Sequence, residues 1–176
     1  MSGLLHESNL LMYDRGTESL WSQSRGEAVV GERTGDVLDL VFQQHLTFGE
    51  VRELYPDALV LSEDTGYTRD YARNPYAGYE LEEGTMFPVT VDDQRFFAKE
   101  LMWSFHVGDT FVAFPYEQLG DETLSRDVEG SEVTIEREGN VIVVTVDGEP
   151  VPGYMEMWFS WATQHEDDGV VWDLEE

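Results

Sequence analysis

The sequence predicts a mainly β protein of the α+β class, folded as an antiparallel, hairpin-rich single domain with two or three short helices. Short runs of β-branched and aromatic residues alternate with turns rich in Gly, Asp and Asn. Two stretches show the spacing of apolar side chains that is typical of helices. With 176 residues and 41% hydrophobic residues, the chain has the length of one domain and enough apolar surface for a packed core.

The strands are expected mostly as neighbouring antiparallel pairs. Residues 3–6 and 10–13 form a hairpin across a Glu-Ser-Asn turn, and residues 19–23 and 27–30 continue the β pattern. Residues 37–42 alternate and are expected to be covered on both faces at least in part. Residues 59–61 are expected as a short buried strand. The later strands are expected at residues 100–105, 110–114, 132–137, 141–146 and 170–172.

The first helix is expected to begin after Thr47. Glu50 follows Thr47 at the capping-box spacing, and Pro56 ends the helix. Residues 115–119 read as one helical turn. Near the end of the chain one helical face carries Trp158, Trp161, Ala162 and His165, and its simplest interpretation is core packing.

The charge is strongly acidic throughout. Asp and Glu number 37 against 10 Lys and Arg, which gives a net charge of −27, and Lys99 is the one lysine. Such a surface suits molar salt, where screening removes self-repulsion, so we expect an organism that grows in high salt. Nucleic acid is not expected as a partner, because binding to phosphates needs clusters of Lys and Arg.

Two features missing from the sequence limit the reactions that the protein can perform and its possible cellular locations. The chain has no cysteine, which excludes disulfides, thiol catalysis and iron–sulfur ligation. No apolar run reaches membrane-spanning length, and no signal peptide follows Met1. We therefore expect no membrane-spanning segment, and a cytoplasmic location if the chain is complete as given.

The most distinctive stretch is residues 64–79, DTGYTRDYARNPYAGY, which holds four of the eight tyrosines. Gly and Pro interrupt it too often for a helix, so a structured loop is expected. Its candidate binding residues are Tyr67, Arg69, Asp70, Tyr71, Asn74, Tyr76 and Tyr79. Flat rings with polar groups between them suit a small-molecule or protein ligand. The alternative is a self-packed loop that stabilises the fold.

Three residues near the N-terminus are candidates for the other wall of such a site. Asp14, Arg15 and Trp21 complete a pocket if their strands face the loop. The alternative is that Asp14 forms a local turn and Trp21 packs in the core.

No local motif identifies an enzyme, a metal site or a cofactor. The chain lacks the G-x-S-x-G, G-x-G-x-x-G and Walker patterns, and its histidines lack metal-ligand spacing. Residues 165–168 are candidates for a hard cation, but on so acidic a chain a solvated acidic turn is the favoured interpretation. We expect no cofactor and no metal.

Several segments, in their order along the chain, resemble the family known as domain of unknown function 3179, which is widespread in bacteria and halophilic archaea. The segments are residues 2–5, 11–15, 19–23, 26–29, 55–62, 64–71, 74–79, 87–89, 99–100, 113–115 and 158–162. The resemblance implies that residues 1–176 form a single domain corresponding to the larger C-terminal part of the family's domain. Relatives usually carry an upstream Tyr-Cys-Pro segment, which this sequence does not show.

Two functions follow as hypotheses. The first is a non-catalytic binding or structural domain in which residues 64–79 stabilise the fold or contact a ligand. The second is an enzyme or metal-dependent protein whose site gathers Tyr67, Arg69 and Asp70 with residues 13–15.

Overall fold

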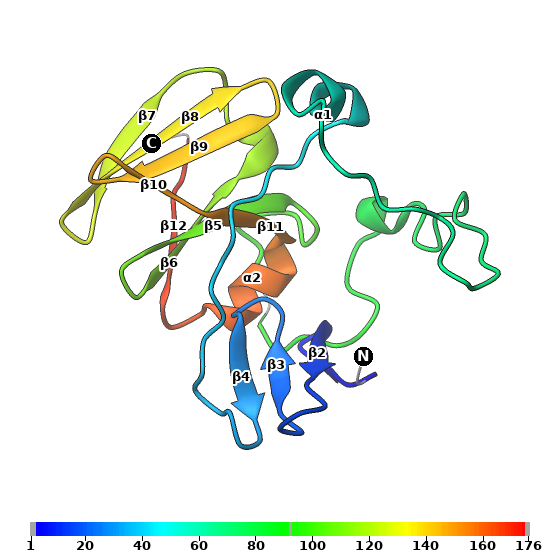
Figure 1. Ribbon diagram of the computed structural model, residues 1–176. Helices are drawn as coiled ribbons and strands as arrows, with labels where there is room; N and C mark the ends of the chain where they lie inside the picture. The colour runs from blue at the N-terminus through cyan, green and yellow to red at the C-terminus, as the bar shows by residue number, and fades with distance from the viewer. Residues whose placement is uncertain (1–2, 92, 175–176) are drawn as a thin grey trace.

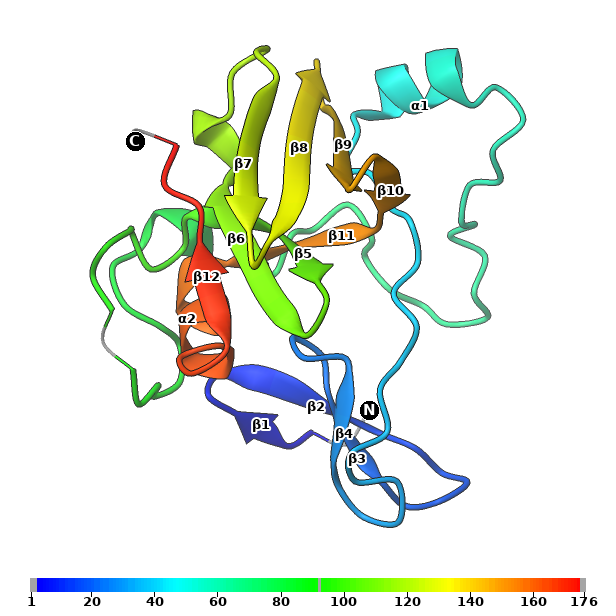
Figure 2. The ribbon, with the colours of Figure 1, turned by 90° about the vertical axis from the view of Figure 1, so that its left-hand side faces the viewer.

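The computed structural model describes residues 3–91 and 93–174 and arranges them as three four-stranded sheets with two α-helices (Figure 1). Strands take 34% of the described residues and helices 12%, which confirms the mainly β prediction. The N-terminal sheet lies below the other two sheets in both Figure 1 and Figure 2, and a long, mostly irregular segment joins them.

The N-terminal sheet is an antiparallel meander in the order β1-β2-β3-β4. Its strands are β1 Leu5–His6, β2 Asn9–Tyr13, β3 Leu20–Ser22 and β4 Glu27–Val30. Each follows the strand pattern expected from the sequence. Leu11 and Ala28 are its buried apolar residues, so this sheet has only a small apolar interior of its own.

The strand expected at residues 37–42 is not formed, and that prediction is wrong. We call residues 37–45 the strap. Only Val37 pairs, through an isolated antiparallel bridge to Glu27. Val41 and Phe42 are 71% and 68% exposed. An alternating pattern becomes a strand only when another strand offers an edge to pair with, and the strap pairs with none beyond Val37. In Figure 1 it runs in cyan from the N-terminal sheet up past β11 to α1.

Helix α1 (Phe48–Leu54) follows the strap and has the expected capping box. The Thr47 side chain accepts a bond from the Glu50 backbone N–H, and the Glu50 side chain accepts from the Thr47 N–H. Asn140 also donates to both Glu50 oxygens, at 3.0 and 2.9 Å. These bonds, that of Asn140 first, lower the pKa of Glu50 to about 2.

The buried strand expected at residues 59–61 is absent, and that prediction is wrong. Leu59 and Leu61 are 100% and 97% exposed. No strand or helix covers this stretch, so its apolar residues lack the neighbours that would make it a core strand. The first short 3₁₀ helix, η1 (Tyr79–Leu81), comes at the end of the Tyr-rich loop.

The remaining two sheets form the body of the protein. One has the order β11-β5-β6-β12, from β5 Leu101–Val107, β6 Thr110–Pro115, β11 Gly153–Met157 and β12 Gly169–Val171, with β12 parallel to β6. The other has the order β10-β9-β8-β7, from β7 Leu124–Val128, β8 Ser131–Glu138, β9 Val141–Val146 and β10 Glu149–Val151. The 3₁₀ turn η2 (Tyr116–Gln118) connects them where a helical turn was expected.

The two sheets of the body enclose the larger hydrophobic cluster, which includes Phe105, Phe114, Ile135 and Ile142. Helix α2 (Trp158–Gln164) packs on the other face of β5 and β6 and forms a second cluster. Trp158, Trp161 and Ala162 are buried there, which confirms that the Trp stripe is core. Among the described residues, the buried and partly buried apolar side chains of both clusters all come from Phe96 onwards.

Candidate functional site

The Tyr-rich loop lies at the surface of the molecule. Tyr67 and Tyr76 are 77% and 61% exposed, and Tyr71 is also exposed. Arg69 and Asp70 are exposed and make no side-chain hydrogen bond or ion pair with any residue that the structure describes. Neither of them is therefore the buried, paired residue of a self-packed loop, nor the wall of a pocket beside a histidine.

The contacts inside the loop are local. Thr65 Oγ1 and the Tyr71 hydroxyl are 2.6 Å apart, and Asn74 Oδ1 accepts a bond from the Tyr76 backbone N–H at 2.9 Å. Tyr79 differs from the other tyrosines, because the Lys99 ammonium lies 4.0 Å from its ring centroid. Lys99 is itself buried and donates to the Glu82 carbonyl.

The structure does not bring the N-terminal candidates to this loop. In both ribbon views the loop lies well away from β2 and β3. Asp14 instead accepts bonds from the Thr17 hydroxyl and the Gly16 N–H, which lower its pKa. Arg15 is exposed and Trp21 lies half-buried in β3. The combined site at Tyr67, Arg69, Asp70 and residues 13–15 is therefore not assembled.

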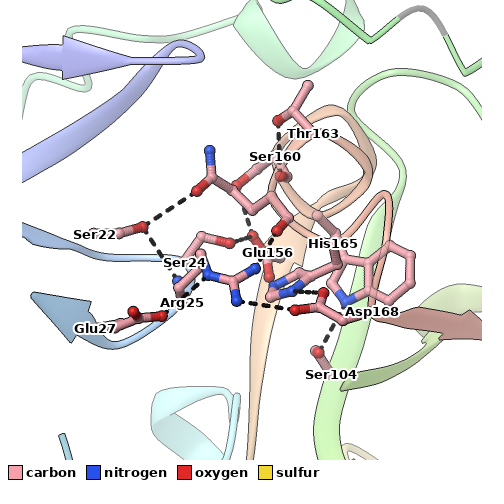
Figure 3. A network of polar contacts seen from close by, with 12 residues as sticks. Ser22, Ser24, Arg25, Glu27, Ser104, Glu156, Ser160, Thr163, His165 and Asp168 are labelled. Atoms are coloured by element: carbon pink, nitrogen blue, oxygen red, sulfur yellow. Dashed lines mark hydrogen bonds and ion pairs between the residues drawn. The ribbon is translucent and has the colours of Figure 1, made fainter. Parts of the chain in front are cut away.

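A buried polar cluster, which the sequence did not suggest, joins the N-terminal sheet to the body (Figure 3). We call it the polar clasp. Its members are Ser24 and Arg25 from the β3–β4 turn, Glu156 from β11, Ser160 from α2, and His165 and Asp168 from the turn between α2 and β12. Ser22 adds a bond of 3.3 Å to the Gln164 side chain.

Glu156 is at the centre of the polar clasp. Its Oε2 lies 2.6 Å from both Ser24 Oγ and Ser160 Oγ, whereas its Oε1 is buried without a hydrogen-bond partner that meets normal geometry. Burial raises the pKa of Glu156 to about 7, although hydrogen bonds from Ser160, Ser24 and Tyr154 oppose the rise. The carboxyl group is therefore neutral in mildly acidic solution.

The number of available protons supports a neutral Glu156. Ser160 has one hydroxyl proton but two acceptors, Glu156 Oε2 at 2.6 Å and Asn9 Oδ1 at 3.0 Å. The Asn9 amide nitrogen donates to the Glu7 carbonyl, which fixes the orientation of the amide. A protonated Glu156 can donate to Ser160 while Ser160 donates to Asn9, so every contact then has a proton.

The second half of the polar clasp is a chain from Arg25 through Asp168 to His165. Arg25 Nη2 lies 2.9 Å from Asp168 Oδ2, and His165 Nδ1 lies 3.3 Å from Asp168 Oδ1. Arg25 also pairs with Glu27 at 3.4 Å and donates to the Gln164 carbonyl. The acidic turn at 165–168 is thus held by an arginine, and the described residues contain no group of three or more metal-binding side chains.

The His165 ring is fully buried between aromatic neighbours. It stacks on Phe111 with 3.9 Å between centroids and lies 5.4 Å from Trp161. Burial lowers the pKa of His165 to about 4, despite the opposing field of Asp168. The imidazole is therefore neutral near pH 7, with its Nδ1 proton directed to Asp168 and Nε2 buried without a partner.

The polar clasp is the main attachment of the N-terminal sheet to the body. Neither hydrophobic cluster includes a described residue of the sheet, and the junction is bridged by hydrogen bonds, by the ion pair of Arg25 with Asp168 and by the contact of Arg25 with the Phe111 ring. The Tyr154 hydroxyl adds one more, to the Ser24 carbonyl at 3.0 Å. Chemically, this arrangement positions the sheet and holds protons in fixed places. The sequence pointed to His165 and Asp168, through the helical face and the acidic run at 165–168, but not to the residues they contact.

The fold and the polar clasp define a β-rich domain whose N-terminal sheet is attached through buried polar groups. The family model described as Protein of unknown function (DUF3179) matches residues 1–147, and the chain belongs to this family. The match includes Ser24 and Arg25 and ends before β11 and α2. Neither curated proteins nor solved structures gave a match to the chain. No helix in the described parts of the chain is long and apolar enough to span a membrane.

Proposed function

We propose that this protein is a non-catalytic binding domain, and that it contacts a protein partner through the aromatic segment, residues 54–87. The supporting observation is the exposure of large apolar side chains along this segment. The exposed residues are Leu54, Tyr55, Leu59, Val60, Leu61, Tyr67, Tyr71, Tyr76, Leu81, Met86 and Phe87. Exposed apolar surface of this extent in a folded protein marks a site of interaction.

The aromatic segment differs from the body of the protein in its exposed apolar side chains. The body buries its large apolar residues in two well-packed clusters, and its sheets expose few of them. Burying a side chain of the size of Leu59 in an interface contributes roughly 1.5–3 kcal/mol of hydrophobic free energy. Tyrosine is enriched in protein interfaces, because its ring buries apolar area while its hydroxyl bonds to polar groups.

The charges of the aromatic segment specify the partner further. Seven carboxylates, at Asp57, Glu63, Asp64, Asp70, Glu80, Glu82 and Glu83, accompany two arginines, Arg69 and Arg73. A complementary surface has an apolar centre and a rim of Lys and Arg. A second copy of this chain would bring the same mostly acidic rim and no complementary charges, so a different protein fits better.

Site-specific photocrosslinking in cells of the source organism tests this proposal. The photoreactive residue p-benzoylphenylalanine replaces Tyr67 in one variant and Val143 in the control, because both side chains are exposed but Val143 lies on β9. We expect one crosslinked protein of defined mass from position 67 that is absent from position 143. Equal products from both positions, or a product of twice the mass of the chain, would refute a distinct partner at this surface.

A further inference from the structure

A hollow of about 330 Å³, which we call the strap pocket, lies where the N-terminal sheet, the strap and the body meet. Its polar lining includes Arg25, His106 and Tyr154. Its apolar lining comes from the strap and from β11, with Leu38, Leu40, Val41 and Met155. Its volume is within the range of small-molecule sites, which are typically apolar with a few polar groups that fix the ligand.

Arg25 is an unusual wall for a binding pocket because two carboxylates already pair with its guanidinium. Its donors go to Glu27, Asp168 and the Gln164 carbonyl, so two carboxylates balance its charge. The Phe111 ring lies 5.3 Å from Cζ and covers one side of the guanidinium. The other flat face of the group is the surface we assign to a ligand. Such a surface stacks on aromatic rings, whereas an anion would meet an arginine whose charge Glu27 and Asp168 already balance.

His106 supplies hydrogen-bonding capacity that is not used within the protein. Its imidazole contacts the Phe111 ring at 4.3 Å between centroids but makes no hydrogen bond with any described residue. Burial lowers the pKa of His106, against the field of Asp168, so the ring is neutral and offers one donor and one acceptor. The Tyr154 hydroxyl also lines the strap pocket, but it is already bonded to the Ser24 carbonyl and interacts with the Ser104 and Glu156 side chains, so His106 is the polar group left for a ligand.

We propose that the strap pocket binds a neutral, planar aromatic ring that carries an amide-like edge, with the ring stacked on Arg25 and the edge hydrogen-bonded to His106. Asp39 also lines the strap pocket, which adds to the discrimination against anions. This site is separate from the aromatic segment and goes beyond the proposed protein contact.

Three related probes test the ligand class on the full chain in molar KCl. Benzamide has the flat ring and the amide, cyclohexanecarboxamide has the amide on a puckered ring, and benzoate has the flat ring with an anionic edge. Titrations followed by NMR should show benzamide binding with a Kd on the order of millimolar, as expected for so small a molecule. Cyclohexanecarboxamide and benzoate should each bind about fivefold more weakly, because each loses one of the two interactions.

Matched histidine variants test the location. His106→Ala should weaken benzamide binding by about fivefold through the lost hydrogen bond. His45→Ala is the control, because His45 lines a neighbouring hollow and not the strap pocket. Equal affinity for benzamide and cyclohexanecarboxamide, tighter binding of benzoate, no binding of benzamide, or equal effects of the two substitutions would each overturn the proposal.

Discussion

Ser24 Oγ donates a hydrogen bond to Glu156 Oε2 across 2.6 Å, although the two residues are 132 positions apart in the sequence. This bond connects the turn between β3 and β4 to an edge strand of the body. It ends on a carboxyl group whose pKa burial raises to about 7. The attachment of the N-terminal sheet is therefore linked to a proton that Glu156 holds at mildly acidic pH.

The first prediction concerns the stability contributed by this proton. The pKa of Glu156 rises from 4.5 to about 7 on folding, so the folded state binds the extra proton. The contribution of Glu156 is greatest below pH 4.5 and is lost as the pH rises through 7, by roughly 3 kcal/mol in all. Glu156→Gln should remove this contribution, so the difference in unfolding free energy between the two proteins, measured by urea unfolding, should change with pH between pH 4.5 and 8. If the unfolding free energies of the two proteins changed in parallel with pH, Glu156 would not hold the proton assigned to it.

The second prediction concerns His165, whose pKa moves the other way. Folding lowers it from 6.5 to about 4, so the stability contributed by the neutral ring is present above pH 6.5 and is lost as the pH falls through 4. NMR of the imidazole nitrogens should show a midpoint near 4 and, at pH 7, a proton on Nδ1. A midpoint above 6 would exclude the buried, neutral ring. The two groups change the stability in opposite directions as the pH rises. In the Glu156→Gln protein the unfolding free energy should therefore increase with pH between 4 and 6.5, as His165 alone predicts.

The third prediction tests the polar clasp as an attachment. Arg25→Gln leaves Asp168 and the Gln164 carbonyl without their donors, which we expect to cost about 2–3 kcal/mol of stability. The loss should be local: amide hydrogen exchange should speed up in β2–β4 but not in β5–β9, because neither hydrophobic cluster reaches the sheet.

Arg33→Gln is the matched control for this experiment. Arg33 pairs with Asp36 at 2.9 Å, but both side chains are at least half exposed, so the pair contributes little. Its loss should leave the free energy of unfolding almost unchanged. Uniform acceleration of exchange in the Arg25→Gln protein, including β5–β9, would show that the sheet and the body unfold as one unit.

The separation of interacting residues along the sequence explains which features could be predicted. The capping box of Thr47 and Glu50 and the hairpin of β8 and β9 depend on neighbours in the chain, and both are present. The strap has the alternation of a strand, but pairing depends on a distant edge. The polar clasp joins Arg25 to Asp168 and Ser24 to Glu156, and no local pattern selects these two acids from 37.

The fourth prediction separates the aromatic segment from the fold. Tyr67 is 77% exposed, so Tyr67→Ala should leave the melting temperature unchanged, in contrast to the stabilising role considered from the sequence. Ile135→Val removes one methylene from the fully buried core and should cost about 0.5–1.5 kcal/mol. Thermal melts of both variants make the comparison. A loss for Tyr67→Ala as large as that for Ile135→Val would return this loop to a structural role.

The fifth prediction follows from the net charge of −27. Carboxylates distributed over the whole chain repel one another when the Debye length is long, about 10 Å at 0.1 M salt and about 3 Å at 1 M. We therefore expect the melting temperature to rise steeply between low and molar KCl, with one sharp transition if residues 1–176 form a single domain. Sucrose at matched water activity serves as the control, because it strengthens burial without screening charge. Equal stabilisation by sucrose and KCl would assign the effect to burial and remove the argument for a high-salt environment.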